Sequence, residues 1–372
     1  MTDSTAVRAG PPSAAQPLFI LAMDHRDSFG RTLFGVHGTP TAEQLAAMRS
    51  AKEVIFTGAQ HLVATEPSAG QLAILVDEQL GADVARNAKG GGFVLAMPVE
   101  KSGADRFTFE YGDDFAAHIE AFDPDWIKVL VRFNPADPAE LRHAQTEALR
   151  RLDAWVTGTR RRWLIELLVP PTREQLAASD DQALYDEHQR PELTAQLIGT
   201  LTAAGIHPAI WKLEGYETTS GAQKVLDAVK ASSAPAASCI VLGRDAPQQQ
   251  VDHWLDIAAP LPGYAGFAIG RSIWEQPIAD YLAGHIDRDV TEARIADRYR
   301  HFIRQYLTAD TAPASKIGDR SEPFTYTHPR LTPDRETRIR KAAAGADPRG
   351  SQLPAWMTQS LLAEVDALRA GE

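Results

Sequence analysis

The sequence predicts a closed (β/α)8 barrel, a TIM barrel, over residues 17–309. Short apolar segments that end in polar or charged residues alternate with Ala- and Leu-rich segments of helical spacing, which is typical of a parallel sheet with crossover helices. Eight such apolar segments occur, the number that closes this barrel. An open doubly wound sheet is the alternative, but no Gly-x-Gly-x-x-Gly motif follows the first predicted strand, and Gly90-Gly91-Gly92 precedes a strand instead of opening a helix.

The predicted strands are residues 18–24, 72–77, 93–99, 126–133, 163–169, 209–214, 239–244 and 266–273. The segments between them, such as residues 41–56 and 191–204, are long enough for crossover helices. Residues 287–307 predict a terminal helix. The single cysteine, Cys239, lies in an apolar strand, where we expect a small buried hydrophobe and no disulfide.

The two ends of the chain differ from the predicted barrel. Residues 1–16 are rich in Ala, Pro and Ser, have no features of a signal peptide, and predict a flexible N-terminal tail. Residues 310–372 form a C-terminal extension whose first part is rich in Pro, charged residues and Gly, which is typical of an extended or partly disordered tail. Residues 354–369 regain helical spacing, and we expect this amphipathic helix to dock on the barrel or on a second subunit of a homo-oligomer.

Composition restricts the partners that the chain is expected to bind. Against 38 basic residues stand 49 acidic ones, a net charge of -11, which disfavours nucleic acid and anionic membranes. No segment approaches the roughly 20 apolar residues of a membrane span. No histidine spacing resembles a zinc site. We therefore expect a cytoplasmic protein without a metal or other cofactor, whose partner is a small molecule.

Ionisable residues stand in the middle of three otherwise apolar predicted strands. Alternation along a strand places Lys128 and Arg132 on one face. On the next two strands, Glu166 is flanked by aliphatic residues, and Lys212 lies on the same face as Glu214. Burying such charges costs several kcal/mol unless they pair or change their protonation. One of them would indicate a structural ion pair. Three on consecutive strands, with Asp24 at the end of the first, predict an active site at the carboxyl end of the barrel.

This combination of charges predicts imine chemistry. A buried lysine beside a second ammonium group is more easily deprotonated and can attack a ketone. The iminium ion that results accepts the electrons of a neighbouring carbon–carbon bond when that bond breaks. Glu166 is placed to move protons between the intermediates. A structural network that merely neutralises Lys128, Glu166 and Lys212 is the alternative.

A second set of residues is expected to bind the substrate. Gly243-Arg244 and Gly270-Arg271 lie at or near the ends of the last two strands, where barrels often build a phosphate site. Lys101 follows the third strand, and His25 lies next to Asp24. For each of these charged loop residues, the alternative is that it lies on the surface and does not bind the substrate.

The motifs together resemble the aldolase domain of bacterial myo-inositol catabolism, which is often fused to a sugar kinase, and more distantly the lysine-dependent tagatose-1,6-bisphosphate aldolases. The matching stretches are LAMDHRDSF (21–29), LVDEQLG (75–81), LAMPVEKSG (95–103), WIKVLVRFNP (126–135), IELLVPP (165–171), IWKLEG (210–215), IVLGRD (240–245) and GFAIGRSIW (266–274).

The resemblance implies that Lys212 forms the Schiff base, with Lys128 and Glu166 as catalytic neighbours and Asp24 as an orienting or acid/base group. It implies that Arg271 and Gly270 bind phosphate. The implied reaction is cleavage of 2-deoxy-5-keto-gluconate 6-phosphate to dihydroxyacetone phosphate and malonate semialdehyde. This chain has no kinase half, and Arg132 indicates a second anion, a carboxylate or a sulfonate, on the substrate. The alternatives are an aldolase for a sulfosugar phosphate or a tagatose or fructose bisphosphate, a metal-dependent aldolase, and a non-catalytic sugar-phosphate-binding protein.

Overall fold

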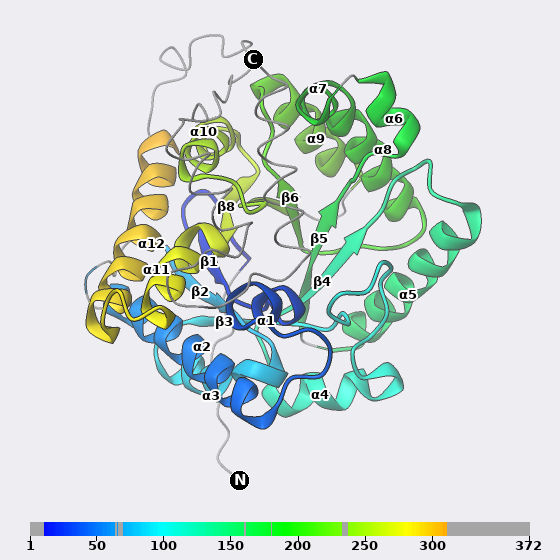
Figure 1. The fold of residues 1–372 in the computed structure, drawn as a ribbon. Coiled ribbons are helices and arrows are strands. Elements are labelled where there is room, and N and C mark those ends of the chain that lie inside the picture. The colour runs from blue at the N-terminus through cyan, green and yellow to red at the C-terminus, as the bar shows by residue number, and fades with distance from the viewer. Residues whose placement is uncertain are drawn as a thin grey trace. The chain divides into compact units, whose positions relative to one another are not determined.

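The computed structural model describes residues 11–63, 65, 70–159, 161–179, 181–232 and 237–310. Eight parallel strands close a barrel in the order of the sequence, which confirms the predicted fold (Figure 1). The strands are β1 (Leu18–Ala22), β2 (Gln71–Leu75), β3 (Val94–Pro98), β4 (Trp126–Arg132), β5 (Arg162–Leu168), β6 (Ile210–Glu214), β7 (Ser238–Leu242) and β8 (Tyr264–Ile269).

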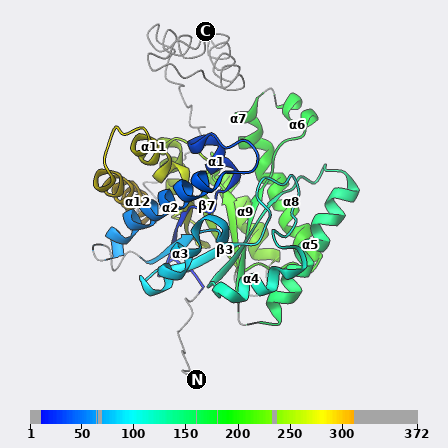
Figure 2. The same cartoon turned by 60° about the horizontal axis from the view of Figure 1, so that its bottom comes forward.

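Helices surround the strands and connect each strand to the next. They are α1 (Asp27–Phe34), α2 (Ala42–Val63), α3 (Glu78–Gly90), α4 (Phe115–Phe122), α5 (Ala139–Thr157), α6 (Arg173–Ala178), α7 (Gln182–Leu184), α8 (Arg190–Ala203), α9 (Thr219–Ser232), α10 (Gln248–Ala258), α11 (Arg271–Leu282) and α12 (Arg288–Asp310), with a 3-10 turn η1 (Gly112–Asp114) and a π-helical turn η2 (Tyr185–Gln189). In Figures 1 and 2, α2 and α12 lie on one side of the strands and α5 and α8 on the opposite side.

The strands divide the core into two layers because side chains alternate across each strand. The inward-facing apolar side chains form a small cluster that fills the barrel, and Trp126 is its largest member. Outward-facing side chains such as Phe19 and Ile165 pack with the helices in the larger cluster. The inward positions that follow the apolar filling along the strands carry charge, among them Lys128 and Glu166. The filling thus forms the floor of a polar site.

Two features differ from the prediction. The eighth strand, expected over residues 266–273, ends at Ile269, because Gly270 precedes the first turn of α11 and Arg271 begins that helix. A short helix, α1, also follows the first strand directly and was not predicted. The predicted crossover helices at 41–56 and 191–204 correspond to α2 and α8, and the predicted terminal helix corresponds to α12.

The described residues near the N-terminus lie against the barrel. The Ser238 hydroxyl donates a hydrogen bond of 3.0 Å to the backbone oxygen of Pro12, and Pro12 is buried. The helix predicted over residues 354–369 lies outside the described residues. Cys239 is buried in β7, as expected, and burial raises the pKa of its thiol to about 12. In the described part of the chain, no helix combines the length and apolar character that crossing a membrane requires.

Candidate active site

A pocket of about 330 Å³ opens at the carboxyl ends of the strands. In this fold that end of the barrel carries the chemistry. All of the residues predicted for the site line this pocket, although they come from seven different strand ends; they are Asp24, His25, Lys101, Lys128, Arg132, Glu166, Lys212, Gly243, Arg244, Gly270 and Arg271. The structure therefore brings the whole predicted set together, and each residue's role stays a prediction.

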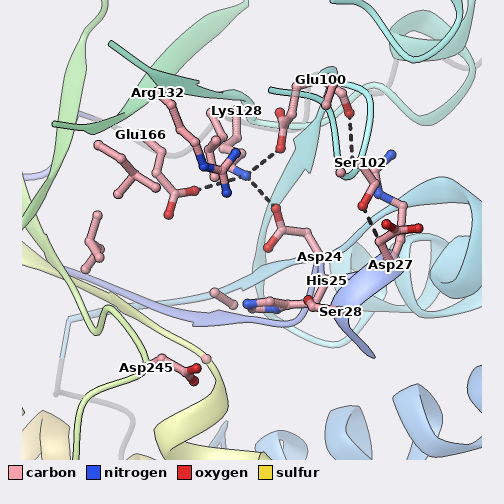
Figure 3. Close-up of a pocket in the computed structure, with 18 of the residues that line it drawn as sticks. Asp24, His25, Asp27, Ser28, Glu100, Ser102, Lys128, Arg132, Glu166 and Asp245 are labelled. Carbon is pink, nitrogen blue, oxygen red and sulfur yellow. Dashed lines mark hydrogen bonds and ion pairs between the residues drawn. The ribbon is translucent and has the colours of Figure 1, made fainter. Parts of the chain in front are cut away.

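Lys128 lies at the centre of a cluster of carboxylates (Figure 3). Its Nζ lies 2.7 Å from Oδ2 of Asp24, 2.5 Å from Oε1 of Glu100 and 3.0 Å from Oε2 of Glu166. These carboxylates come from the ends of β1 and β3 and from β5, and all four side chains are buried. Three carboxylates around one buried ammonium group hold it in a fixed position.

Glu166 connects the two lysines of the site. Its Oε1 lies 2.9 Å from Nζ of Lys212, while Oε2 contacts Lys128. Glu166 and Lys212 are paired in the register of β5 and β6, so both side chains point into the barrel from the same level. One carboxylate therefore bridges two ammonium groups.

The charges of this cluster determine its protonation. Burial opposes the charge of Lys128, but Asp24, Glu100 and Glu166 raise its pKa well above the ordinary value, so Lys128 stays an ammonium ion. Burial also opposes the charge of Glu166, and the two lysines nevertheless lower its pKa. In the described residues, no three His, Cys, Asp or Glu side chains are arranged to hold a metal ion.

The arginines after β7 and β8 are paired with acids. Arg271 Nη1 lies 2.6 Å from Oδ2 of Asp245. Arg244 lies 2.5 Å from Oδ2 of Asp186 through Nη1 and 3.0 Å from Oε1 of Glu214 through Nε. Arg244 and Asp245 have φ values of 44° and 64°, a left-handed conformation that costs non-glycine residues about 1–3 kcal/mol each. The loop after β7 thus holds its charged residues in a strained conformation at the pocket.

Gly270 allows the chain to pass closely over the first strand. A Cβ at this position would lie 2.5 Å from the backbone oxygen of Ala22 and 3.0 Å from Cε1 of His25. Any larger residue would push α11 away from β1. Because α11 begins at Arg271, its first amide groups and the Arg271 side chain lie together at the pocket, an arrangement suited to an anion.

The wall of the pocket at the ends of β3 and β4 also carries cations. Arg132 extends from the end of β4 toward the Lys128 cluster (Figure 3), and its guanidinium group has no hydrogen bond or ion pair with any described residue. Lys101 and Arg106 line the same wall and are exposed. An anion that binds at Arg132 therefore displaces no carboxylate, whereas an anion that binds at Arg271 competes with Asp245.

His25 is neutral in the folded protein. Burial, together with the charge of Arg271, lowers the pKa of its ring to about 3, although Asp24 opposes this shift. Its Nδ1 is buried and lacks a hydrogen-bond partner in the part of the chain that the structure describes. A neutral imidazole beside Asp24 fits a polar contact to substrate better than a contact to phosphate.

Glu100 belongs to the cluster but was not among the predicted site residues. It directly follows the third predicted strand, where a position in a surface loop was the competing interpretation for its charge. That loop is a hairpin in which Lys101 N donates to Thr108 O at 2.8 Å. Arg26 fastens it by donating to the backbone oxygen of Glu100 at 2.7 Å and to Oε2 of Glu110 at 2.7 Å. Continuing the alternation of β3 past its last residue would have placed Glu100 on the inward face.

The comparison with protein families identifies the chain. A family model described as "Uncharacterized protein conserved in bacteria (DUF2090)" matches residues 7–309. The chain belongs to the DUF2090 family. The match spans the barrel and ends within α12. No curated protein matches the chain.

Solved structures confirm the fold that this DUF2090 member adopts. Fructose-bisphosphate aldolase from Plasmodium falciparum, in complex with TRAP and a small-molecule inhibitor, superposes with a TM-score of 0.55 at 12% sequence identity, covering 79% of this chain and 91% of that one. Cgl0159 from Corynebacterium glutamicum superposes with a TM-score of 0.51 at 14% identity, covering 81% and 88%. At these identities the likeness establishes the barrel fold and nothing more.

Proposed function

We propose that the protein is a lysine-dependent (class I) aldolase that cleaves a phosphorylated keto-sugar acid. The observation that carries this proposal is the bridge in which Glu166 contacts both Lys128 and Lys212 at the inner end of the pocket. One lysine contacts three carboxyl groups and is held as an ammonium ion, and the other has one such contact among the described residues. The two lysines are thus suited to different tasks.

In the first half of the reaction, Lys212 acts as the nucleophile. Its amine adds to the substrate ketone, and loss of water from the carbinolamine gives an iminium ion. Glu166, 2.9 Å away, is placed to take a proton from Lys212 before the attack. Lys128 stays charged and can donate to the ketone oxygen.

In the second half, the carbon–carbon bond breaks. A base removes the proton of the hydroxyl group two carbons from the iminium carbon, the bond electrons move to the iminium nitrogen, and an aldehyde leaves. Asp24 lines the pocket and can accept this proton, because Glu166 already holds the proton of Lys212. Protonation of the enamine and hydrolysis then release dihydroxyacetone phosphate and restore Lys212.

The two walls of the pocket support this choice of substrate class. Arg271 and the first turn of α11 fit a phosphate, and Arg132, which has no ion pair with any described residue, fits a second anion. Together with the sequence resemblance, this favours 2-deoxy-5-keto-gluconate 6-phosphate over a neutral keto-sugar. A sulfosugar phosphate or a hexose bisphosphate satisfies the same two sites and is the alternative. The name of the Plasmodium falciparum neighbour agrees with an aldolase reaction.

Trapping with borohydride tests the reaction type. The protein is incubated with dihydroxyacetone phosphate, reduced with sodium borohydride, and analysed by intact mass and peptide mapping. We expect one stable adduct, on Lys212, and the same yield when a chelator is present. Lys212→Met is expected to abolish the adduct, while Lys224→Met, which changes an exposed lysine outside the pocket, keeps it.

Other outcomes assign a different function. An adduct on Lys128 reverses the roles of the two lysines but keeps the chemistry. Binding of the phosphate without any adduct or cleavage indicates a non-catalytic sugar-phosphate-binding protein. Loss of activity on chelation, with no adduct, contradicts the class I mechanism.

A further inference from the structure

The buried cluster contains more acids than bases. Two ammonium groups, Lys128 and Lys212, face three carboxyl groups, Asp24, Glu100 and Glu166, in one connected set of ion pairs. With every group ionised, these five buried side chains have a net charge of −1. Arg132 extends toward them but is exposed, so solvent screens its charge. An uncompensated buried charge costs several kcal/mol. One bound proton removes this charge.

The contacts indicate which carboxyl group holds the proton. Glu166 uses both oxygens on ammonium groups, and Asp24 contacts Lys128 and lies in the field of Lys212. Glu100 contacts Lys128 through Oε1 alone, and its Oε2 is buried without a hydrogen-bond partner in the described residues. A carboxylate oxygen in that position is poorly stabilised, whereas a neutral carboxyl group is tolerated.

The charged groups around Glu100 agree with this assignment. Burial raises its pKa and Asp24 raises it further, while Lys128 and Arg26 offset only part of the rise. For Asp24 and Glu166 the balance is opposite, and their pKa values are lowered despite burial. Arg26 contributes little to the carboxyl group of Glu100 because it donates to the backbone oxygen of that residue and to the side chain of Glu110.

We propose that Glu100 holds a proton in the resting site and supplies it, through Lys128, to the oxygen that leaves as water when Lys212 forms its imine. The inference rests on the proposed function and adds a residue to it. Glu100 lies 2.5 Å from Lys128, and Lys128 and Lys212 contact the two oxygens of one carboxylate, so a carbinolamine on Lys212 forms beside Lys128. Glu100 is thus a positioning residue that acts through Lys128.

The step balances in atoms and charge. Lys128 gives a proton to the carbinolamine hydroxyl group, the carbon–oxygen bond breaks, water leaves, and the nitrogen of Lys212 forms the carbon–nitrogen double bond. The amine of Lys128 then takes the proton of Glu100. The new positive charge of the iminium ion is matched by the new negative charge of Glu100, so the buried cluster keeps its net charge.

Infrared difference spectroscopy tests the resting protonation without any substrate. We expect the wild-type protein at neutral pH to show the carbonyl stretch of a protonated carboxyl group, and Glu100→Gln to lose it. Glu78→Gln is the matched control, because Glu78 is a partly buried carboxylate outside the pocket that contacts His118. Retention of the band in Glu100→Gln, or its absence from the wild type, overturns the proposal whether or not the protein is an aldolase.

The rate of imine formation, measured by trapping with borohydride, tests whether the proton of Glu100 is used in this step. We expect Glu100→Gln to slow imine formation by about 10²-fold with little change in the affinity for dihydroxyacetone phosphate. The wild-type rate should fall as pH rises and Glu100 loses its proton, and this fall should be missing in Glu100→Gln. Glu100→Asp, which keeps an acid, should recover part of the rate.

An unchanged rate and pH profile in a folded Glu100→Gln protein overturns the proposal, whereas absence of any adduct from the wild type contradicts the aldolase function instead.

Discussion

Lys212 and Glu166 occupy paired positions in the register of β5 and β6, and their side chains form an ion pair in which Nζ lies 2.9 Å from Oε1. Neighbouring positions on adjacent parallel strands bring the two side chains to the same level of the barrel. The pair is therefore fixed by the backbone as well as by charge, and its geometry does not depend on a loop.

Glu166→Gln tests what this bridge contributes. The amide leaves two ammonium groups close together without the carboxylate that separates them, so we expect a loss of about 3 kcal/mol or more in the free energy of unfolding. Glu147→Gln, which removes an exposed carboxylate paired with Arg150, should change that free energy by less than about 1 kcal/mol. Chemical denaturation measures the free energy of unfolding of both variants. Equal losses in Glu166→Gln and Glu147→Gln would mean that the bridge is not buried in solution.

Arg271 and Asp245 are expected to have opposite effects on phosphate binding. Arg271→Ala removes a charge-assisted contact and should raise KM for a phosphorylated substrate by about tenfold or more, with little effect on its dephosphorylated analogue. Asp245→Asn removes the carboxylate that competes for Arg271 at 2.6 Å and should lower KM for the same substrate. Steady-state kinetics of the two variants provide the test. A rise in KM for Asp245→Asn would show that Asp245 orients Arg271 and does not compete with phosphate.

Arg132→Leu should change specificity without changing stability. The guanidinium group has no partner among the described residues, so we expect a change of less than about 0.5 kcal/mol in the free energy of unfolding. Preference for substrates with a second carboxylate or sulfonate should fall by about tenfold. Arg142→Leu, on an exposed position of α5, is the control. A large loss of stability in Arg132→Leu would instead identify the arginine as a structural counter-charge.

His25 is expected to make the folded protein sensitive to acid. The pKa of its ring is lowered from 6.5 to about 3, so the unfolded chain binds a proton at this residue at a higher pH than the folded protein does. Its contribution to stability is therefore complete above pH 6.5 and is lost as the pH falls toward 3. His25→Gln should lose less stability than the wild type between neutral pH and about pH 5. Denaturation midpoints measure this, with exposed His207→Gln as the control that follows the wild type.

The strands and the charges within them were predictable because both depend on local pattern. Lys128, Glu166 and Lys212 stood out as charges in apolar runs, and the alternation of side chains placed them on inward faces. The end of β8 was not predicted correctly. Apolar residues recur at Ile273 and Trp274, in the first turn of α11, and the hydrophobic pattern does not show that the backbone changes direction at Gly270.

The pairing of the site's charges could not be predicted, because the partners come from distant segments. Asp186, in η2 after β5, contacts Arg244 after β7, and Asp245, whose backbone is left-handed, contacts Arg271 after β8. Glu100 follows the third predicted strand beside Lys101, where a position in a surface loop was the competing interpretation, yet Arg26 holds that loop against the barrel and keeps the carboxyl group buried.

The sequence alone thus determined the barrel and which side chains face its interior, since strand alternation and the number of repeats are properties of the chain itself. The tertiary structure decided which charges neutralise each other. Closing the barrel sets the distances between strand ends that lie far apart in the sequence. Within the described part of the chain, those distances leave Arg132 without a partner and pair Arg271 with Asp245. They also place three carboxyl groups around Lys128, one more than Lys128 and Lys212 can balance.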